Sequence, residues 1–256
     1  MSCAGVPPAG VDRIREIAIN NEAVPAELDG YRIVFVSDIH FKNNFSRERL
    51  EILIDAINAS KPDCIILGGD HTLGTREINE FAEAASRLSA PDGVYAVIGN
   101  HDFYNGRKQS IQTLRNAGIV VLEESLIITP RNIVIAGFGD FNDVFPVLKY
   151  FHEIIDKDRF TVLATHNPYY AEYADISLFD VMLAGHTHGG QITFFSYAPM
   201  LGRGTGQKYR TGTVYKDGVP VVISNGAGYG GSGILRFRLG APSDFLLITL
   251  QSNGPM

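Results

Sequence analysis

The chain has few cysteines, no long apolar stretch and no excess of positive charge, and each of these deficits excludes a class of protein. Two cysteines among 256 residues cannot form a disulfide framework, which favours a reducing compartment. No apolar stretch approaches the roughly 18 residues that a membrane-spanning helix needs. The formal net charge of −6 lacks the basic surplus that proteins use to displace counterions from nucleic acid. We therefore expect no nucleic-acid partner.

The N-terminal segment is rich in glycine, proline and alanine, and it lacks the basic start and apolar core of a signal peptide. We expect residues 1–10 to form a disordered tail. Residues 11–256 should form a single domain, because no linker, internal repeat or low-complexity segment divides them. A cytoplasmic location is the simplest expectation.

Short apolar runs alternate with amphipathic helices along the first half of the chain. Runs rich in valine, isoleucine and aromatic residues are typical of strands that are buried on both faces. Leucine and isoleucine spaced along one helical face over residues 50–57 predict a helix that ends at Ala59 and is capped by Ser46. After Gly118 the runs become shorter, and Asp217-Gly218 predicts a hairpin turn. Further helices are expected over residues 75–88, 107–117 and 145–155, and further strands over 15–20, 234–238 and 245–250. These elements predict an α/β fold with α+β character, in which two mixed β-sheets pack as a sandwich flanked by helices.

Five of the apolar runs are followed at once by residues that can bind a metal ion. Five of the seven histidines lie at these places. Ligands of open α/β sheets bind at the carboxyl ends of the strands, so we expect these polar side chains to converge in space. Asp70 follows two glycines, which let the backbone approach closely, and its carboxylate can bridge two cations. The residues are Asp38, His40, Asp70, Asn100, His101, Asp102, His166, His186 and His188.

The order of these motifs resembles that of the calcineurin-like metallophosphoesterase family, whose pattern is D-x-H, G-D, G-N-H-D, H and G-H-x-H. All five blocks are present between Asp38 and His188. The resemblance implies the four-layer fold of metallophosphoesterases and a centre with two divalent cations. It assigns one cation to Asp38, His40, Asp70 and His188, and the other to Asp70, Asn100, His166 and His186. The sequence Gly189-Gly190-Gln191 resembles a subgroup of small bacterial phosphohydrolases.

The same resemblance implies an enzyme that hydrolyses the P–O bond of a phosphate ester or pyrophosphate. A hydroxide bridging two cations about 3.5–4 Å apart would attack the phosphorus. His101 would contact the phosphate and protonate the leaving oxygen, and Asp102 would accept its other ring N–H. Imidazole mixed with carboxylate favours Mn, Fe, Zn or Co over Mg. The expected substrate is a small phosphorylated molecule. A non-catalytic metal-binding scaffold of this fold is an alternative, against which the intact ligand positions argue.

An aromatic segment, Phe194–Leu201, follows the last of these residues and precedes three cations, Arg203, Lys208 and Arg210. One interpretation is a loop whose aromatic rings fold inward. The other is an edge that faces a lipid-linked substrate or a membrane surface. A phospholipid or nucleotide-lipid phosphoesterase with peripheral membrane contact is therefore a second expectation.

Three further features have simpler interpretations. His71, which follows Asp70, is expected to support the site rather than bind metal or substrate. Asp140 and Asp143 are explained by a turn rich in glycine, phenylalanine and asparagine. Residues 226–231 match G-x-G-x-x-G, but a strand is expected after them, whereas a dinucleotide site needs a helix. We expect these glycines to let the backbone pass close to the metal site.

Overall fold

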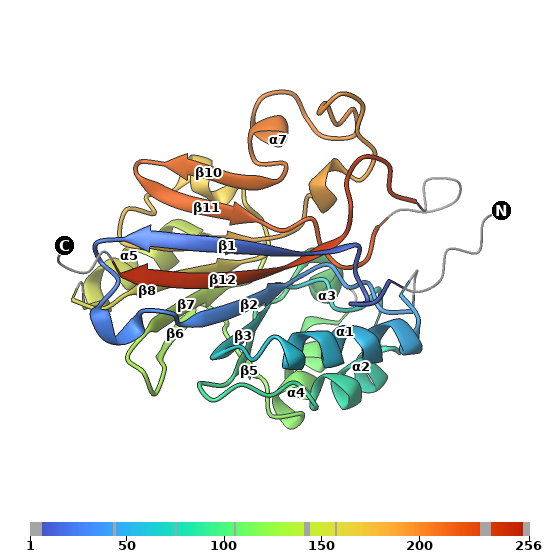
Figure 1. Ribbon diagram of the computed structural model, residues 1–256, viewed down its shortest axis with the longest axis horizontal. Coiled ribbons are helices and arrows are strands. Elements are labelled where there is room, and N and C mark those ends of the chain that lie inside the picture. The colour runs from blue at the N-terminus through green and yellow to red at the C-terminus, as the bar shows by residue number, and fades with distance from the viewer. Residues whose placement is uncertain are drawn as a thin grey trace.

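A computed structural model describes residues 7–42, 45–74, 76–104, 106–140, 144–156, 158–230 and 237–252, without the side chains of residues 144–147. Within these residues the chain forms two six-stranded sheets that pack face to face, with helices on the outside (Figure 1). The predicted sandwich of two mixed sheets flanked by helices is confirmed.

The first sheet has the strand order β1-β12-β2-β3-β4-β5. Strands β2 to β5 are parallel, whereas β12 is antiparallel to β2 and parallel to the edge strand β1. The strands are β1 (Arg13–Asn21), β2 (Arg32–Val36), β3 (Cys64–Leu67), β4 (Val94–Ala96), β5 (Val120–Val121) and β12 (Asp244–Ser252).

The second sheet has the order β10-β11-β9-β8-β7-β6. Its four central strands are parallel, and antiparallel strands close both edges. The strands are β6 (Ser125–Ile128), β7 (Val134–Phe138), β8 (Thr161–Thr165), β9 (Val181–Ala184), β10 (Gly212–Lys216) and β11 (Val219–Ile223). The predicted hairpin joins the last two, with Asp217 and Gly218 at positive φ.

Both faces of each central strand are buried, which explains the continuous apolar runs of the sequence. In β2, Ile33 and Phe35 pack into the core between the sheets, and Val34 and Val36 pack on the other face. Burying each such side chain stabilises the fold by about 1.5–3 kcal/mol. The strands can therefore hold rigid positions for the residues at their ends.

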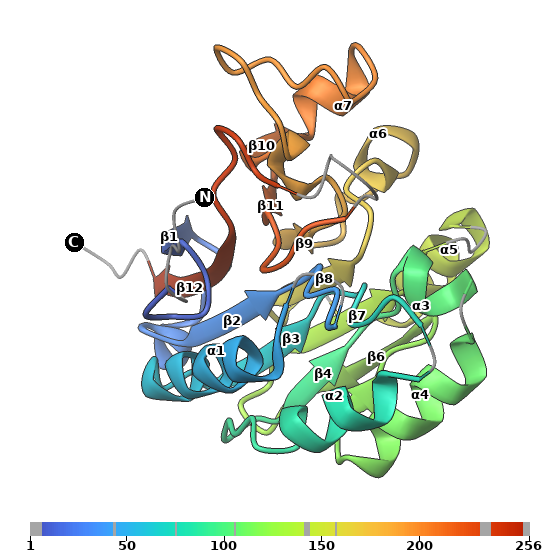
Figure 2. The same cartoon turned by 90° about the vertical axis from the view of Figure 1, so that its right-hand side faces the viewer.

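Helices α1 (Arg47–Ala59), α2 (Ile78–Ala85) and α4 (Arg107–Asn116) cover the outer face of the first sheet (Figure 2). The predicted cap is present, since the Ser46 side chain accepts the N–H of Arg49. Helices α5 (Val144–Ile154) and α6 (Tyr170–Tyr173) cover the second sheet. The short elements are η1 (Ala26–Leu28), α3 (Asn100–Tyr104), η2 (His188–Gly190) and α7 (Thr205–Lys208).

Some sequence expectations differ from the structure. Helix α2 is shorter than expected, and α3 was not expected because it has no apolar periodicity of its own. Pro7–Gly10 were assigned to a disordered tail, yet they form a turn in which the carbonyl of Gly10 accepts the Nε–H of Arg49 at 2.6 Å. The strand expected over 234–238 lies largely outside the described residues, and Phe237 and Arg238 are irregular. No helix of the described part is long and apolar enough to cross a membrane.

Candidate metal centre

The predicted ligands converge at the carboxyl ends of the parallel strands of both sheets. Asp38 and His40 follow β2, Asp70 follows β3, and Asn100 begins α3 after β4. The second sheet contributes the remaining three after β8 and β9, namely His166, His186 and His188. In Figure 2 the arrowheads of β2, β3 and β8 point toward this common region.

One group of donor atoms surrounds the position expected for the first cation. Nε2 of His40 lies 3.2 Å from Nε2 of His188. Nε2 of His188 lies 3.5 Å from Oδ1 of Asp38. Nε2 of His40 also lies 3.7 Å from Oδ2 of Asp70.

A second group lies on the other side of Asp70. Nδ1 of His186 is 3.0 Å from Oδ1 of Asn100 and 3.2 Å from Nε2 of His166. That Nε2 lies 3.5 Å from Oδ2 of Asp70. The same carboxylate oxygen therefore borders both groups. The Nδ1 of His166 is 2.8 Å from the carbonyl of Gly68, to which it donates, and this tautomer leaves Nε2 available to a cation.

A buried oxygen atom without a hydrogen-bond partner gives independent support for bound cations. Oδ1 of Asp38 is buried and has no hydrogen-bond partner within the described part of the chain. A buried carboxylate oxygen without a partner is costly unless a cation binds it. Donor atoms separated by 3.2–3.7 Å can share one ion at the usual bond lengths of about 2.0–2.2 Å.

The buried carboxylates of the centre also need positive charge beside them. Burial alone would raise the pKa of Asp70, but the neighbouring His166 and His40 hold this pKa well below its usual range. Burial alone would lower the pKa of His166, yet Asp70 and Asp38 raise it to about 10. Burial lowers the pKa of His188 to about 3. These shifts show that the carboxylates and imidazoles of the two groups interact strongly across the centre.

The backbone of the ligands is strained. Five of the seven have φ in the left-handed region, between 47° for His40 and 70° for His186, and the others are Asp38, Asp70 and His188. Residues other than glycine pay roughly 1–2 kcal/mol for this conformation. Gly226, from the rejected dinucleotide match, approaches closely as expected: a Cβ on it would lie 2.6 Å from the Cβ of Asp38.

Asp102 does not have the partner that the sequence predicted. Its buried carboxylate lies 2.9 Å from Nδ1 of His71 and accepts the backbone N–H groups of Asp70 at 2.8 Å and Gly99 at 3.1 Å. The expected bond to the His101 ring is absent among the described contacts of Asp102, because α3 turns this carboxylate inward. Asp102 and His71 therefore join the loops that carry the ligands.

His101 lies at the mouth of the centre. Its side chain is 39% exposed, and its Nε2 is 4.0 Å from Oδ2 of Asp70. The mouth opens into a pocket of about 260 Å³ that Asn100, His186, Met200 and Leu201 also line. The ring can therefore meet a ligand that enters this pocket.

Two residues that lie near the centre were not predicted to belong to it. Arg238 donates to the carbonyls of His188 at 2.9 Å and Asn225 at 2.6 Å, and burial lowers its pKa to about 10. Asp140 lies close to His166 and His186. A signal for Asp140 was present, since it follows an apolar run and a glycine, as Asp70 does. Asp143 lies outside the described residues.

Comparisons with known proteins also indicate a metal-dependent phosphoesterase. The model of the calcineurin-like phosphoesterase family matches residues 31–190. An uncharacterized metallophosphoesterase of Aquifex aeolicus (strain VF5) is 30% identical over 256 residues, which cover 94% of this chain and 93% of that protein. The phosphodiesterase YaeI of Escherichia coli (strain K12) is 32% identical over 175 residues, which cover 63% and 62%.

A solved structure shares the fold. The protein TT1561 of Thermus thermophilus superposes with a TM-score of 0.55 at 14% identity, covering 77% of this chain and 90% of that one. The strand-end ligands, the match over residues 31–190 and the similarity to the Aquifex aeolicus protein together show that the chain belongs to the calcineurin-like phosphoesterase family, a family of metal-dependent phosphoester hydrolases.

Proposed function

We propose that the protein is a dinuclear metal-dependent phosphohydrolase that cleaves the P–O bond of a phosphate ester or pyrophosphate. The observation that carries this proposal is the position of Asp70, whose Oδ2 lies within 3.7 Å of histidines from both ligand groups. When bound, two cations supply a hydroxide near neutral pH and neutralise the charge of the phosphoryl group.

The side chains of the centre have two further roles, metal binding and proton donation. Asp38, His40 and His188 hold the first cation, and Asn100, His166 and His186 hold the second, with Asp70 shared. His101 donates a proton to the leaving oxygen, which its half-exposed position at the pocket mouth allows. The name of the Escherichia coli relative makes a phosphodiester the first substrate class to test.

The experiment compares p-nitrophenyl phosphate, bis-p-nitrophenyl phosphate and pyrophosphate as substrates. Protein depleted of metal by chelation is assayed before and after addition of Mn²⁺. We expect hydrolysis of at least one substrate to require the added ion. A protein that binds Mn²⁺ and hydrolyses none of the three is better described as a non-catalytic scaffold.

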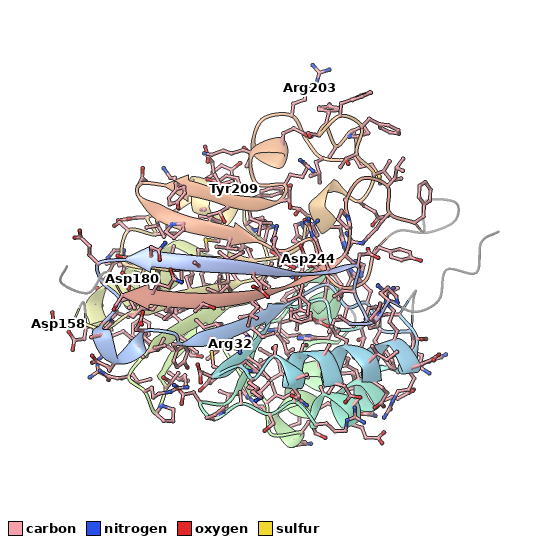
Figure 3. The ribbon with its side chains drawn as sticks, viewed as in Figure 1. Arg32, Asp158, Asp180, Arg203, Tyr209 and Asp244 are labelled. Carbon is pink, nitrogen blue, oxygen red and sulfur yellow. The ribbon has the colours of Figure 1, made fainter. Side chains whose placement is uncertain are left out.

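A second candidate, hydrolysis of a lipid-linked phosphate at a membrane surface, is supported by the aromatic lip, which we define as Phe194–Met200. Phe194 and Tyr197 exchange backbone hydrogen bonds, and the turn between them carries Phe195 fully exposed. Met200, 52% exposed, also lines the pocket of the metal centre. Figure 3 shows Arg203 at the upper edge of the molecule, pointing outward.

The charged side chains near the lip favour binding to an anionic membrane surface. No acidic residue occurs between Asp180 and Asp217, although the chain carries a net charge of −6. Lys208 is paired with Glu172 at 2.6 Å, which leaves Arg203 and Arg210 as the cations nearest the lip. Aromatic side chains beside cations are typical of proteins that bind anionic membrane surfaces. Flotation with liposomes that contain phosphatidylserine tests this candidate at low salt. Protein that stays at the bottom of the gradient with anionic and neutral liposomes alike argues for a substrate without a lipid part.

A further inference from the structure

Asp140 is a buried carboxylate at the edge of the metal centre to which none of the family motifs gives a role. It follows β7 and is 4% exposed. Its backbone N–H donates to the carbonyl of Ile98 at 2.9 Å, which ties it to the chain just before Asn100. The residue is thus held in place by both sheets.

The carboxylate faces the second ligand group. One of its oxygens and one ring nitrogen each of His166 and His186 all lie within 4.8 Å of one another. Tyr170, which begins α6, donates its hydroxyl to Oδ1 of Asp140 at 2.8 Å. This bond restrains the carboxylate at its place beside the two histidines.

The two ligand groups differ in charge without Asp140. Asp38 lies nearer the first group, with its Oδ1 3.5 Å from Nε2 of His188 and 3.9 Å from Nε2 of His166. The first cation also borders Asp70. The second shares Asp70, but its other three ligands are a neutral amide and two imidazoles. A buried cation with so little counter-charge is costly.

We propose that the Asp140 carboxylate neutralises charge of the second cation, as Asp38 does for the first, while Asp70 is shared by both. The negative charge acts whether Asp140 touches the ion or one of its water molecules. An added oxygen ligand also favours Mn²⁺ at this site relative to a site of nitrogen ligands. The inference rests on the proposed dinuclear centre.

The test measures metal binding rather than activity. Metal-depleted protein is titrated with Mn²⁺, and bound ion is followed by electron paramagnetic resonance and by calorimetry. We expect two bound ions in the wild type. In Asp140→Asn the second ion should bind about 10–100-fold more weakly, while the first keeps its affinity.

Asp180→Asn is the matched control. Asp180 is a partly buried aspartate, but its carboxylate accepts the N–H of Thr161 at 2.7 Å, at the opposite end of β8 from His166. Figure 3 shows it on the left of the molecule, away from the lip side. This variant should bind both ions as the wild type does.

The outcomes separate this inference from the proposed function. Wild-type affinities for both ions in Asp140→Asn overturn the inference and leave the dinuclear centre intact. A wild type that binds fewer than two ions removes the proposed function instead. If Asp140→Asn fails to fold, the same titration is made with Asp140→Ser, which removes the charge but keeps an oxygen that can accept the Tyr170 hydroxyl; an unchanged second affinity in that variant overturns the inference.

Discussion

Oδ2 of Asp102 lies 2.9 Å from Nδ1 of His71, and both side chains are buried behind the ligand loops. The same carboxylate accepts the backbone N–H groups of Asp70, His71 and Gly99. This pair therefore connects the loop after β3, which carries the shared ligand, to the loop after β4, which leads to Asn100.

Asp102→Ala should destabilise the protein strongly. The change leaves three buried backbone N–H groups without their acceptor, each at a cost of about 1–3 kcal/mol. We expect the free energy of unfolding to fall by about 3 kcal/mol or more, as measured by urea unfolding of the metal-free protein. An Asp102→Ala variant as stable as the wild type would show that this carboxylate does not hold the loops.

Asp70→Asn should remove metal and activity together. The Asp70 carboxylate borders both ligand groups, so its loss weakens both sites. Lost charge stabilisation of several kcal/mol corresponds to a fall in kcat/KM of about 1000-fold. Elemental analysis of the purified variant and an assay with added Mn²⁺ measure the two effects. Wild-type values of both would exclude Asp70 from the centre.

The sequence predicted the two sheets and the convergence of the seven proposed ligands because both depend on local patterns. Apolar runs buried on both faces identify parallel strands, and the residues that follow them must meet at one edge of the sheets. The partner of Asp102 could not be predicted in this way, since it depends on how α3 turns side chains between loops 31 residues apart. The left-handed φ of His40 is likewise imposed by tertiary contacts, against the local preference of the residue.

The position of Asp140 beside the second ligand group could not be predicted from its local sequence either. Its local pattern matched that of Asp70, but an aspartate in a glycine-rich turn is also explained by turn chemistry. Only the packing of β7 beside β8 brings it near His166, and that adjacency is a property of strand order.

His101→Ala should separate proton donation from metal binding. The ring lies at the pocket mouth beside His40 and Asp70 but belongs to neither proposed ligand set, so we expect a metal content close to that of the wild type. Loss of a general acid costs about 10²–10⁴-fold, and the cost rises as the leaving group becomes a poorer one. Rates for p-nitrophenyl and alkyl phosphodiesters measure this difference. Equal losses for both leaving groups would argue against the acid role.

Metal removal should lower the thermal stability. Cations that bind only the folded state stabilise it by about 2.7 kcal/mol each at 100 times their dissociation constant. Two such cations contribute about 5.4 kcal/mol, which for a chain of this size corresponds to a rise in Tm of about 10–20 °C. We expect chelation to lower Tm by this amount and Mn²⁺ to restore it in a thermal melt. Asp70→Asn is the control, in which added Mn²⁺ should change Tm little.

Phe195→Asn should stabilise the fold while weakening membrane association. Phe195 has φ of 47°, a conformation that asparagine tolerates much better than an aromatic residue, and its fully exposed ring gains nothing from burial. We expect the free energy of unfolding to rise by about 1 kcal/mol, or Tm by about 2–4 °C. Phe194→Asn is the matched control, since Phe194 is also exposed but is not among the residues with positive φ. Both variants should float less with anionic liposomes, whereas only Phe195→Asn should melt at a higher temperature; unchanged flotation of both would remove the aromatic lip as a membrane contact.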